Sequence, residues 1–501
     1  MAKLQAPKVI FMGVVVILMA ITIAFGYTGY ALHGFLDSIF FMPPAVSLAV
    51  GQGFNNPVTD LRSSWGDPTG QERYLYFPPL FPLVISAFIS RAVSLPPPQQ
   101  ALFASGILVA LTILLLSFVF YKIATLHGRK FNLFSAVLIS TILIIILRSS
   151  WIFMARPETL ENLLLVAGFL TAFFARRVRQ IIFSFAIILG LMAATHPFGV
   201  FFFASFAGLF FSFFYDGWRR VITYLASTYL SASVVFILVM QFSPYSVSET
   251  ITGVLRHASI ETQRISFDRV AAFVGSPYAI LYGIAVLLIA AFCTHFYLRY
   301  RTQIKTPSLF VLFSIVIGSL VVYFAVMGVK TYYASLFSML IFSMLVYYLI
   351  HVVNHRLIKQ ATLFFLIIFA VLSIKPILVF PSFLQKGVSI TEAREAFAPV
   401  AARYPGTDIF IAAHLWVLSE DYERMHYIGD LTPEQKARRP LILVLDQTYS
   451  YGNYSPTAAP LPEVEGCPLQ ENHFVGEVPE FFGYKVSSAM PGYGFAVYIC
   501  K

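Results

Sequence analysis

Charge is the scarcest property of this 501-residue chain. Only 12% of its residues are charged, about half the share that is usual in a soluble protein. Hydrophobic residues make up 58% of the chain, and the mean hydropathy is +0.77. This composition excludes an ordinary soluble fold and predicts an α-helical protein that crosses the membrane many times.

Several motifs of nucleotide and hydrolytic chemistry are also missing. The chain has no GxxxxGK[ST] loop, no GxGxxG that opens a helix after a strand, and neither GxSxG nor HExxH. No repeat of fixed period is present, which counts against transporter folds that are built on internal repeats. We expect no nucleic-acid partner, and an activated group would have to arrive on a lipid.

Windows of about 20 residues reveal twelve apolar segments. They cover residues 8–30, 79–95, 101–122, 131–150, 159–175, 181–195, 197–215, 220–241, 277–298, 307–326, 332–352 and 360–381. The first segment is too long for the apolar core of a signal peptide and lacks a small-x-small cleavage site. It is therefore predicted to be a retained transmembrane helix.

Basic clusters separate these segments and predict the topology. The clusters are Lys122 with Arg129 and Lys130, Arg176 with Arg177 and Arg179, Arg219 with Arg220, Arg299 with Arg301 and Lys305, and Arg356 with Lys359. All five fall on the cytoplasmic side if residues 79–122 make one net crossing. We therefore expect about eleven crossings, with the N-terminus inside and the C-terminus outside. The proline-flanked segment 79–95 is then broken, partly inserted or parallel to the interface.

Residues 382–501 differ in character from the rest of the chain. They hold 14 acids against 9 lysines and arginines, whereas residues 1–381 hold 10 acids against 25. We expect a transmembrane domain over 1–381, with a first external loop at 31–78, and a small external α/β domain over 382–501. In that domain an oxidising outer compartment would allow a disulfide between Cys467 and Cys500. The sequence leaves this disulfide and two free thiols as equal alternatives. The helix of this domain is predicted over residues 391–404, and its strands over 408–413, 440–446 and 494–500.

The first external loop holds Asp37, Asp60, Asp67 and Glu72, four of the ten acids in residues 1–381. Asp37 lies just beyond the outer end of the first apolar segment. It either caps the amphipathic segment that follows or acts as a general base. At the membrane boundary, such a base would reach both a lipid-borne donor and a water-soluble acceptor.

A second group of ionisable residues surrounds Pro157, which suits the first turn of a helix. Acids near a helix N-terminus are favourable there, so Arg156 and Glu158 also have a purely structural interpretation. Glu161 lies one turn further in and is costly to bury. Its position favours a functional role, with Arg156 or a bound cation as its partner.

Three other short segments each have a structural and a functional interpretation. His196 lies in a short outer turn, where a hydrogen-bonded structural histidine is commoner than a ligand. His257 and Glu261 are spaced i, i+4, which suits either a divalent metal or a surface pair. Lys330 stands at a helix entrance and suits a phosphate contact, and Tyr333 suits the aromatic belt at the interface.

In this order, these features resemble the GT-C superfamily of lipid-dependent membrane glycosyltransferases, particularly the protein O-mannosyltransferases and aminoarabinose transferases. The pattern D-x(7)-A-x(5)-G begins at Asp37, P-P-L-F-P covers 78–82 and A-R-P-E-T-L covers 155–160. Residues 330–333, Lys-Thr-Tyr-Tyr, are similar to the entrance of a late helix. The resemblance covers most of residues 1–380.

The resemblance implies a GT-C-like fold that transfers a sugar, with inversion, from a polyprenyl phosphate to a lipid, glycan or protein acceptor. The reaction would take place on the outer face of the inner (plasma) membrane. Asp37 would be the base and Glu158 the second acid. The other implied contacts are Arg156, Arg256 and Lys330 for the donor phosphate; Glu161, His196 and Tyr333 for the substrate; and Glu72 and His257 for a divalent metal, the one cofactor suggested.

The chain also departs from these families. Ser38 stands where many relatives have Glu, and Phe77 stands where aminoarabinose transferases have Lys, so that sugar is not implied. The loop 242–276 leaves no room for the β-trefoil of eukaryotic protein mannosyltransferases, which favours a bacterial-type enzyme. Two other classes stay open: a transporter or flippase of a lipid-linked or anionic solute, which would place ionisable residues near the bilayer midplane, and a non-catalytic scaffold.

Overall fold

The computed structural model describes parts of the apolar region 1–381 and of the C-terminal region 382–501. The described residues are 38–54, 56, 58, 78–90, 92–131, 136, 156–243, 246–252, 294, 296–326, 346–350, 356–372, 390–419, 424–428, 431, 440–445, 467–473, 480–481, 484–485 and 495–500.

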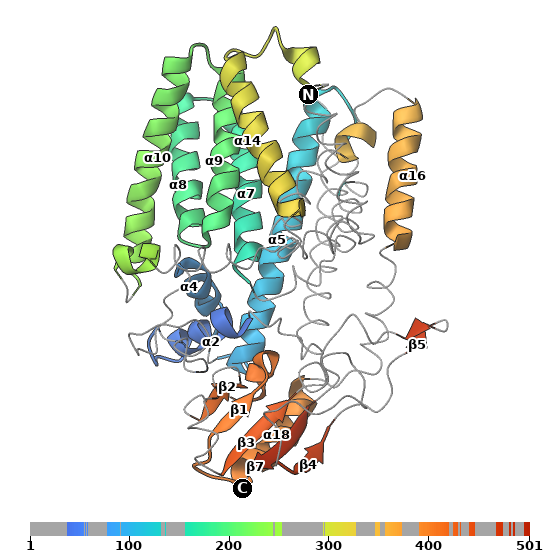
Figure 1. Cartoon of the computed structure of the whole chain (residues 1–501). Helices are drawn as coiled ribbons and strands as arrows, with labels where there is room; N and C mark the ends of the chain where they lie inside the picture. Colours follow the sequence, from blue (N-terminus) through green and yellow to red (C-terminus); the bar gives the residue numbers. More distant parts are fainter. Residues whose placement is uncertain are drawn as a thin grey trace.

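The described helices form a bundle, and a small sheet lies at one end of it (Figure 1). The helices of residues 1–381 are α2 (Ser38–Ala49), α4 (Leu80–Ala87), α5 (Pro97–Leu126), α7 (Pro157–Phe174), α8 (Val178–Ala193), α9 (Pro197–Phe214), α10 (Trp218–Met240), α14 (Pro307–Val326) and α16 (Arg356–Leu372). Four of these, α5, α7, α9 and α14, begin with a proline, whose missing N–H costs nothing in a first turn.

Helices α5 and α7 pack together, as do α8 with α10 and α9 with α14. Small residues allow the closest approach. A Cβ on Gly190 of α8 would lie 2.6 Å from Val235 Cβ of α10, so only glycine lets the two backbones pack this tightly. Aromatic rings fill the centre of the bundle, where Phe185 contacts Phe203 and Phe211 edge-on, with ring centroids 5.2 and 5.9 Å apart.

Four of the five predicted basic clusters gather at one end of the bundle. Arg176 lies in the turn α7–α8 and Arg219 in the first turn of α10, and both of these helix ends lie away from the sheet (Figure 1). The start of α14 joins them, because Thr306 N donates to Ser212 O at the end of α9 over 2.9 Å. The end of α5 is there too, with Lys122 Nζ 4.0 Å from the centroid of the Phe174 ring.

Two of the described helices, α5 and α10, are long and apolar enough to cross a membrane. Helix α10 does not behave like the buried core helix of a soluble protein, since Leu230 and Leu238 are 72% and 59% exposed. Helix α4 has eight residues and is about 12 Å long, against about 30 Å of hydrocarbon. This helix alone is too short to span, and the topology of 79–95 stays a prediction. The total of about eleven crossings stays a prediction.

The C-terminal region contains helix α18 (Ile390–Arg403), the short 3₁₀ helix η2 (Ala413–Leu418) and a five-stranded sheet in the order β2-β1-β3-β7-β4. Strand β1 pairs in parallel with β2 and β3, whereas β7 is antiparallel to β3 and β4. The strands are β1 (Ile409–Ile411), β2 (Met425–Tyr427), β3 (Leu441–Leu445), β4 (Leu469–Asn472) and β7 (Ala496–Cys500), with β5 (Glu480–Phe481) and β6 (Tyr484–Lys485) as a separate pair. The predicted helix and three predicted strands are confirmed.

The two faces of this sheet bury different clusters, because successive side chains of a strand point to opposite sides. Ile442 and Val444 of β3 face the bundle side, and Leu441 and Leu443 face the far side. The far-side cluster includes Cys467 and Cys500, which form a disulfide. The disulfide alternative is therefore the correct one.

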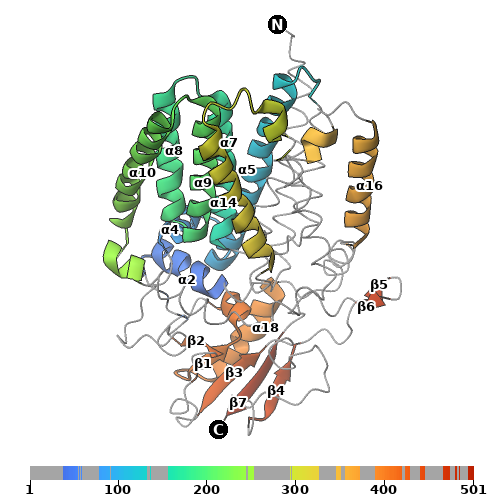
Figure 2. The same cartoon turned by 45° about the horizontal axis from the view of Figure 1, so that its top comes forward.

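Two large buried clusters stabilise the molecule. One fills the bundle among α7, α8 and α9, and the other joins α2, α4 and α5 to α18, η2 and the sheet. Figure 2 shows α2 between the bundle and the sheet. The C-terminal region is therefore packed directly against α2, which belongs to the predicted first external loop, and the exact division at residues 381 and 382 stays a prediction.

Candidate functional site

Buried ionisable side chains gather where α7 begins, at the end of the bundle nearest the sheet (Figure 1). Arg156 is the N-cap residue of α7 in an extended conformation, Pro157 follows it and Glu158 lies in the first turn. Proline at the first helical position and an acid beside the positive end of the helix dipole both favour a helix start here. The predicted helix start is confirmed.

Arg156 and Glu158 form an ion pair inside the protein. Arg156 Nη2 donates to Glu158 Oε1 over 2.8 Å, and Nε donates to Oε2 over 3.1 Å. The two residues are 3% and 2% exposed. This forked geometry fixes the carboxylate with two parallel bonds, so the pair is rigid and carries no net charge by itself.

Glu161 is completely buried one turn further along α7. Gly199 N, in the first turn of α9, donates to Glu161 Oε1 over 3.1 Å. Within the described part of the chain, Oε2 has no hydrogen-bond partner. The sequence suggested Arg156 or a cation as the partner of Glu161; the structure adds a backbone amide, while Arg156 is engaged with Glu158.

Gly199 is required at this position for steric reasons. A Cβ there would overlap Glu161 Oε1 and would lie 2.7 Å from Met192 Cε. Glycine therefore admits the carboxylate to the gap between α7 and α9. Sequence analysis missed this residue, although it stands in the same short T-H-P-F-G segment as His196.

His196 lies in the turn between α8 and α9 and is 2% exposed. Its backbone N donates to Met192 O over 2.9 Å. In the same turn, Ala194 O accepts a hydrogen bond from Leu80 N over 2.8 Å, which connects the turn to the start of α4. The structure thus brings Arg156, Glu158, Glu161 and His196 to the same end of the bundle.

Three more buried oxygens were not predicted. Asn162 Oδ1, Gln99 Oε1 and Ser105 Oγ have no hydrogen-bond partner among the described residues. Buried polar groups without a hydrogen-bond partner are rare in proteins, so each of them needs a structural or functional explanation. Asn162 directly follows Glu161, so the pair Glu-Asn early in an apolar helix is the sequence signal that identifies it.

The remaining predicted site residues lie outside the described residues: Asp37, Glu72, Arg256, His257, Lys330 and Tyr333. The described part of the chain contains no group of three or more His, Cys, Asp or Glu side chains that is arranged to hold a metal ion. Asp37 directly precedes Ser38, the first residue of α2, and is thus attached to a described element of known position.

Comparison with protein-family models finds no match, and no curated protein matches. Among solved structures, the chain is similar to the archaeal oligosaccharyltransferase AglB from Archaeoglobus fulgidus in complex with an inhibitory peptide and a dolichol-phosphate. The TM-score is 0.45 and the identity 13%, over 88% of this chain and 70% of that chain.

The chain is also similar to ArnT from Cupriavidus metallidurans bound to undecaprenyl phosphate, with a TM-score of 0.41 and 14% identity over 99% of this chain and 98% of that chain. These structure neighbours are GT-C glycosyltransferases, the class that the sequence resembles. Because both TM-scores are below 0.5, the roles proposed below rest on the residues of this chain.

Proposed function

We propose that this chain transfers a sugar from a polyprenyl-phosphate donor to a hydroxyl-bearing acceptor on the outer face of the plasma membrane. One observation carries the proposal. Arg156, Glu158 and Glu161 are buried together at the end of the bundle opposite the basic turns. Lysine and arginine favour the cytoplasmic side of a membrane, so the buried acids lie at the outer end.

The reaction assigns a task to each residue. The acceptor oxygen forms a bond to the anomeric carbon, the bond from that carbon to the phosphate oxygen breaks, and the polyprenyl phosphate leaves with the electron pair. Asp37 takes the acceptor proton, and Glu158, held by Arg156, orients the acceptor. Negative charge grows on the phosphate, where a nearby guanidinium or ammonium stabilises it. Arg156, Arg256 and Lys330 are proposed for that role.

Glu161, His196 and Tyr333 are proposed substrate contacts, and Glu161 has the strongest support. One of its oxygens is fixed by Gly199, and the other has no hydrogen-bond partner within the described residues. Such an oxygen is ready to accept a bond from a sugar or acceptor hydroxyl. Glu72 and His257 remain a proposed metal pair, and no step of the reaction proposed here passes through a metal.

The position of these residues favours an enzyme over a transporter. Glu161 is the fifth residue of α7, about 6 Å from the helix start. A substrate carrier would place its ionisable groups near the bilayer midplane, about 15 Å from either interface. The buried acids are thus at the depth where a lipid-linked phosphate meets a water-soluble acceptor.

The test compares purified wild type and Asp37→Asn in proteoliposomes that contain cell-extracted polyprenyl-phosphate sugars and a membrane extract as acceptor. We expect release of free polyprenyl phosphate by the wild type and a loss of about 10²-fold or more in the variant, because a general base contributes that much. Asp216→Asn is the matched control, since Asp216 is an exposed acid at the other end of the bundle. Equal release by Asp37→Asn and the control would refute the assigned base, and transport without release would refute the reaction.

A further inference from the structure

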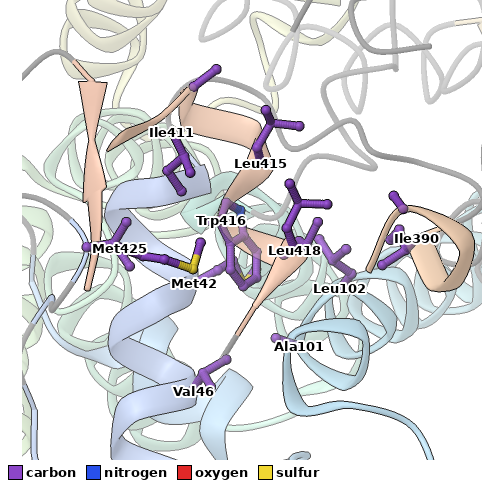
Figure 3. Close-up of a cluster of buried hydrophobic side chains, with 14 of the residues drawn as sticks. Met42, Val46, Ala101, Leu102, Ile390, Ile411, Leu415, Trp416, Leu418 and Met425 are labelled. Atoms are coloured by element: carbon purple, nitrogen blue, oxygen red, sulfur yellow. The ribbon is translucent and has the colours of Figure 1, made fainter. Parts of the chain in front are cut away.

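The short helix η2 places one large ring in the joint between the C-terminal region and the membrane region. Trp416 is fully buried, in one cluster with Met42 and Val46 of α2 and with Ala101 and Leu102 of α5. Figure 3 shows the Trp416 ring in the middle of these side chains. Three elements from distant parts of the sequence, η2, α2 and α5, thus meet around one indole.

A second contact joins β2 to Val58 in the predicted first external loop. Tyr427 N of β2 donates to Val58 O over 2.7 Å. Since β2 is the edge strand of the sheet, this bond adds the loop segment to the sheet's open side. The Tyr427 ring also meets Phe40 of α2 edge-on, with the ring centroids 6.4 Å apart.

The same joint extends to the candidate site. Leu160 stands between Glu158 and Glu161 in α7 and belongs to the cluster that contains Trp416 and Phe41. The α2 segment therefore contacts the C-terminal region on one side and helices of the membrane region on the other. A shift of the C-terminal region would move α2 relative to α7.

We propose that the C-terminal domain is a positioning element of the active site, with Trp416 and Tyr427 holding the first external loop in place. Two described parts of that loop, α2 and Val58, contact this domain. The effect of the C-terminal domain on turnover rests on the proposed function, in which Asp37, the residue before α2, is the general base. The effect of the domain on the position of the loop does not depend on that function.

The experiment uses Trp416→Ala with a spin label on Gln52→Cys in a Cys293→Ser background. Gln52 is exposed and lies just after α2, so a label there reports on the loop. Leu443→Ala is the matched control, because it opens a cavity on the far face of the same sheet. Phe40→Ala tests the joint from the loop side and leaves the C-terminal domain intact.

We expect the label to become more mobile in Trp416→Ala and Phe40→Ala and to stay unchanged in Leu443→Ala. In the same proteins, kcat for phosphate release should fall roughly 10²-fold in Trp416→Ala, since a misplacement of about 1 Å has that effect. KM for the lipid donor should be unchanged, and Trp416→Phe should restore most of kcat. The Leu443→Ala control should keep the wild-type kcat.

Three results would overturn the inference. The first is a label as immobile in Trp416→Ala and Phe40→Ala as in the wild type, the second is a mobile label in Trp416→Ala with full kcat, and the third is the same loss of kcat in Leu443→Ala. Absence of release in every protein, wild type included, would refute the proposed reaction alone. The label would then still decide whether the domain holds the loop.

Discussion

The hydrogen bond between Gly199 and Glu161 gives the sharpest prediction, Gly199→Ala. The new methyl group would overlap Glu161 Oε1 and would lie 2.9 Å from Glu161 Cδ. Because Gly199 N donates to the same oxygen over 3.1 Å, the carboxylate cannot retreat without losing this bond. The substitution thus acts on the position of one carboxylate in the candidate site.

The expected cost follows from three contributions. Overpacking a filled site costs about 1–3 kcal/mol, and separating a buried donor from its acceptor costs about 1–3 kcal/mol more. Alanine regains up to about 1 kcal/mol of helix propensity. Gly199→Ala should therefore lower the free energy of unfolding by about 2–4 kcal/mol. In a Glu161→Ala background the clash with the carboxylate is gone, so the same change should be nearly neutral.

The assay is a double-mutant cycle on unfolding in detergent, combined with polyprenyl-phosphate release. We expect a coupling of about 2–4 kcal/mol between positions 199 and 161, because the cost of Gly199→Ala disappears in Glu161→Ala and contacting residues are not additive. Gly168→Ala is the steric control, since its Cβ would overlap the Phe203 ring away from Glu161. Coupling below about 0.5 kcal/mol, or equal coupling of Gly168→Ala to Glu161→Ala, would show that Gly199 does not position Glu161.

Two further predictions concern the ion pair and the orientation. Arg156→Met should destabilise the protein by about 3–5 kcal/mol, because it leaves Glu158 buried without its main partner. The double variant Arg156→Met with Glu158→Leu should recover most of that stability but no activity. Denaturation measures the stability and phosphate release measures the activity, and a double variant as unstable as the single one would contradict the reasoning. In a Cys293→Ser background, a membrane-impermeant thiol reagent should label Gln52→Cys from outside and Arg176→Cys only from the cytoplasm; the reverse pattern in intact cells would invert the proposed orientation.

Much of the fold is readable from local sequence patterns. Apolar runs separated by prolines and basic turns predict α7, α8, α9, α10 and α14 within a few residues of their observed bounds. Each of these helices is determined by its own hydrophobicity and by its end signals, which lie within one segment. The strands β1, β3 and β7 are predictable for the same reason, as short apolar runs between turn residues.

Contacts between distant segments are not readable in this way. Nothing near residue 416 indicates that its indole packs on α2, about 370 residues earlier in the chain. Likewise, Gly199 looks like a glycine of any apolar helix until α7 is placed beside α9. Both contacts depend on which helix faces meet, and apolar residues on nearly every face of these helices leave that choice open.

Stability does not explain why polar residues occupy the start of α7. A buried ion pair such as Arg156–Glu158 is often replaced by apolar side chains without loss of stability. An unpartnered buried oxygen, such as Glu161 Oε2 within the described residues, costs about 1–3 kcal/mol. Residues that break the local packing rules are expected where function requires them. The start of α7 is therefore under a chemical constraint, and a sugar or acceptor hydroxyl bound there would supply the hydrogen-bond donor that Glu161 Oε2 lacks within the described residues.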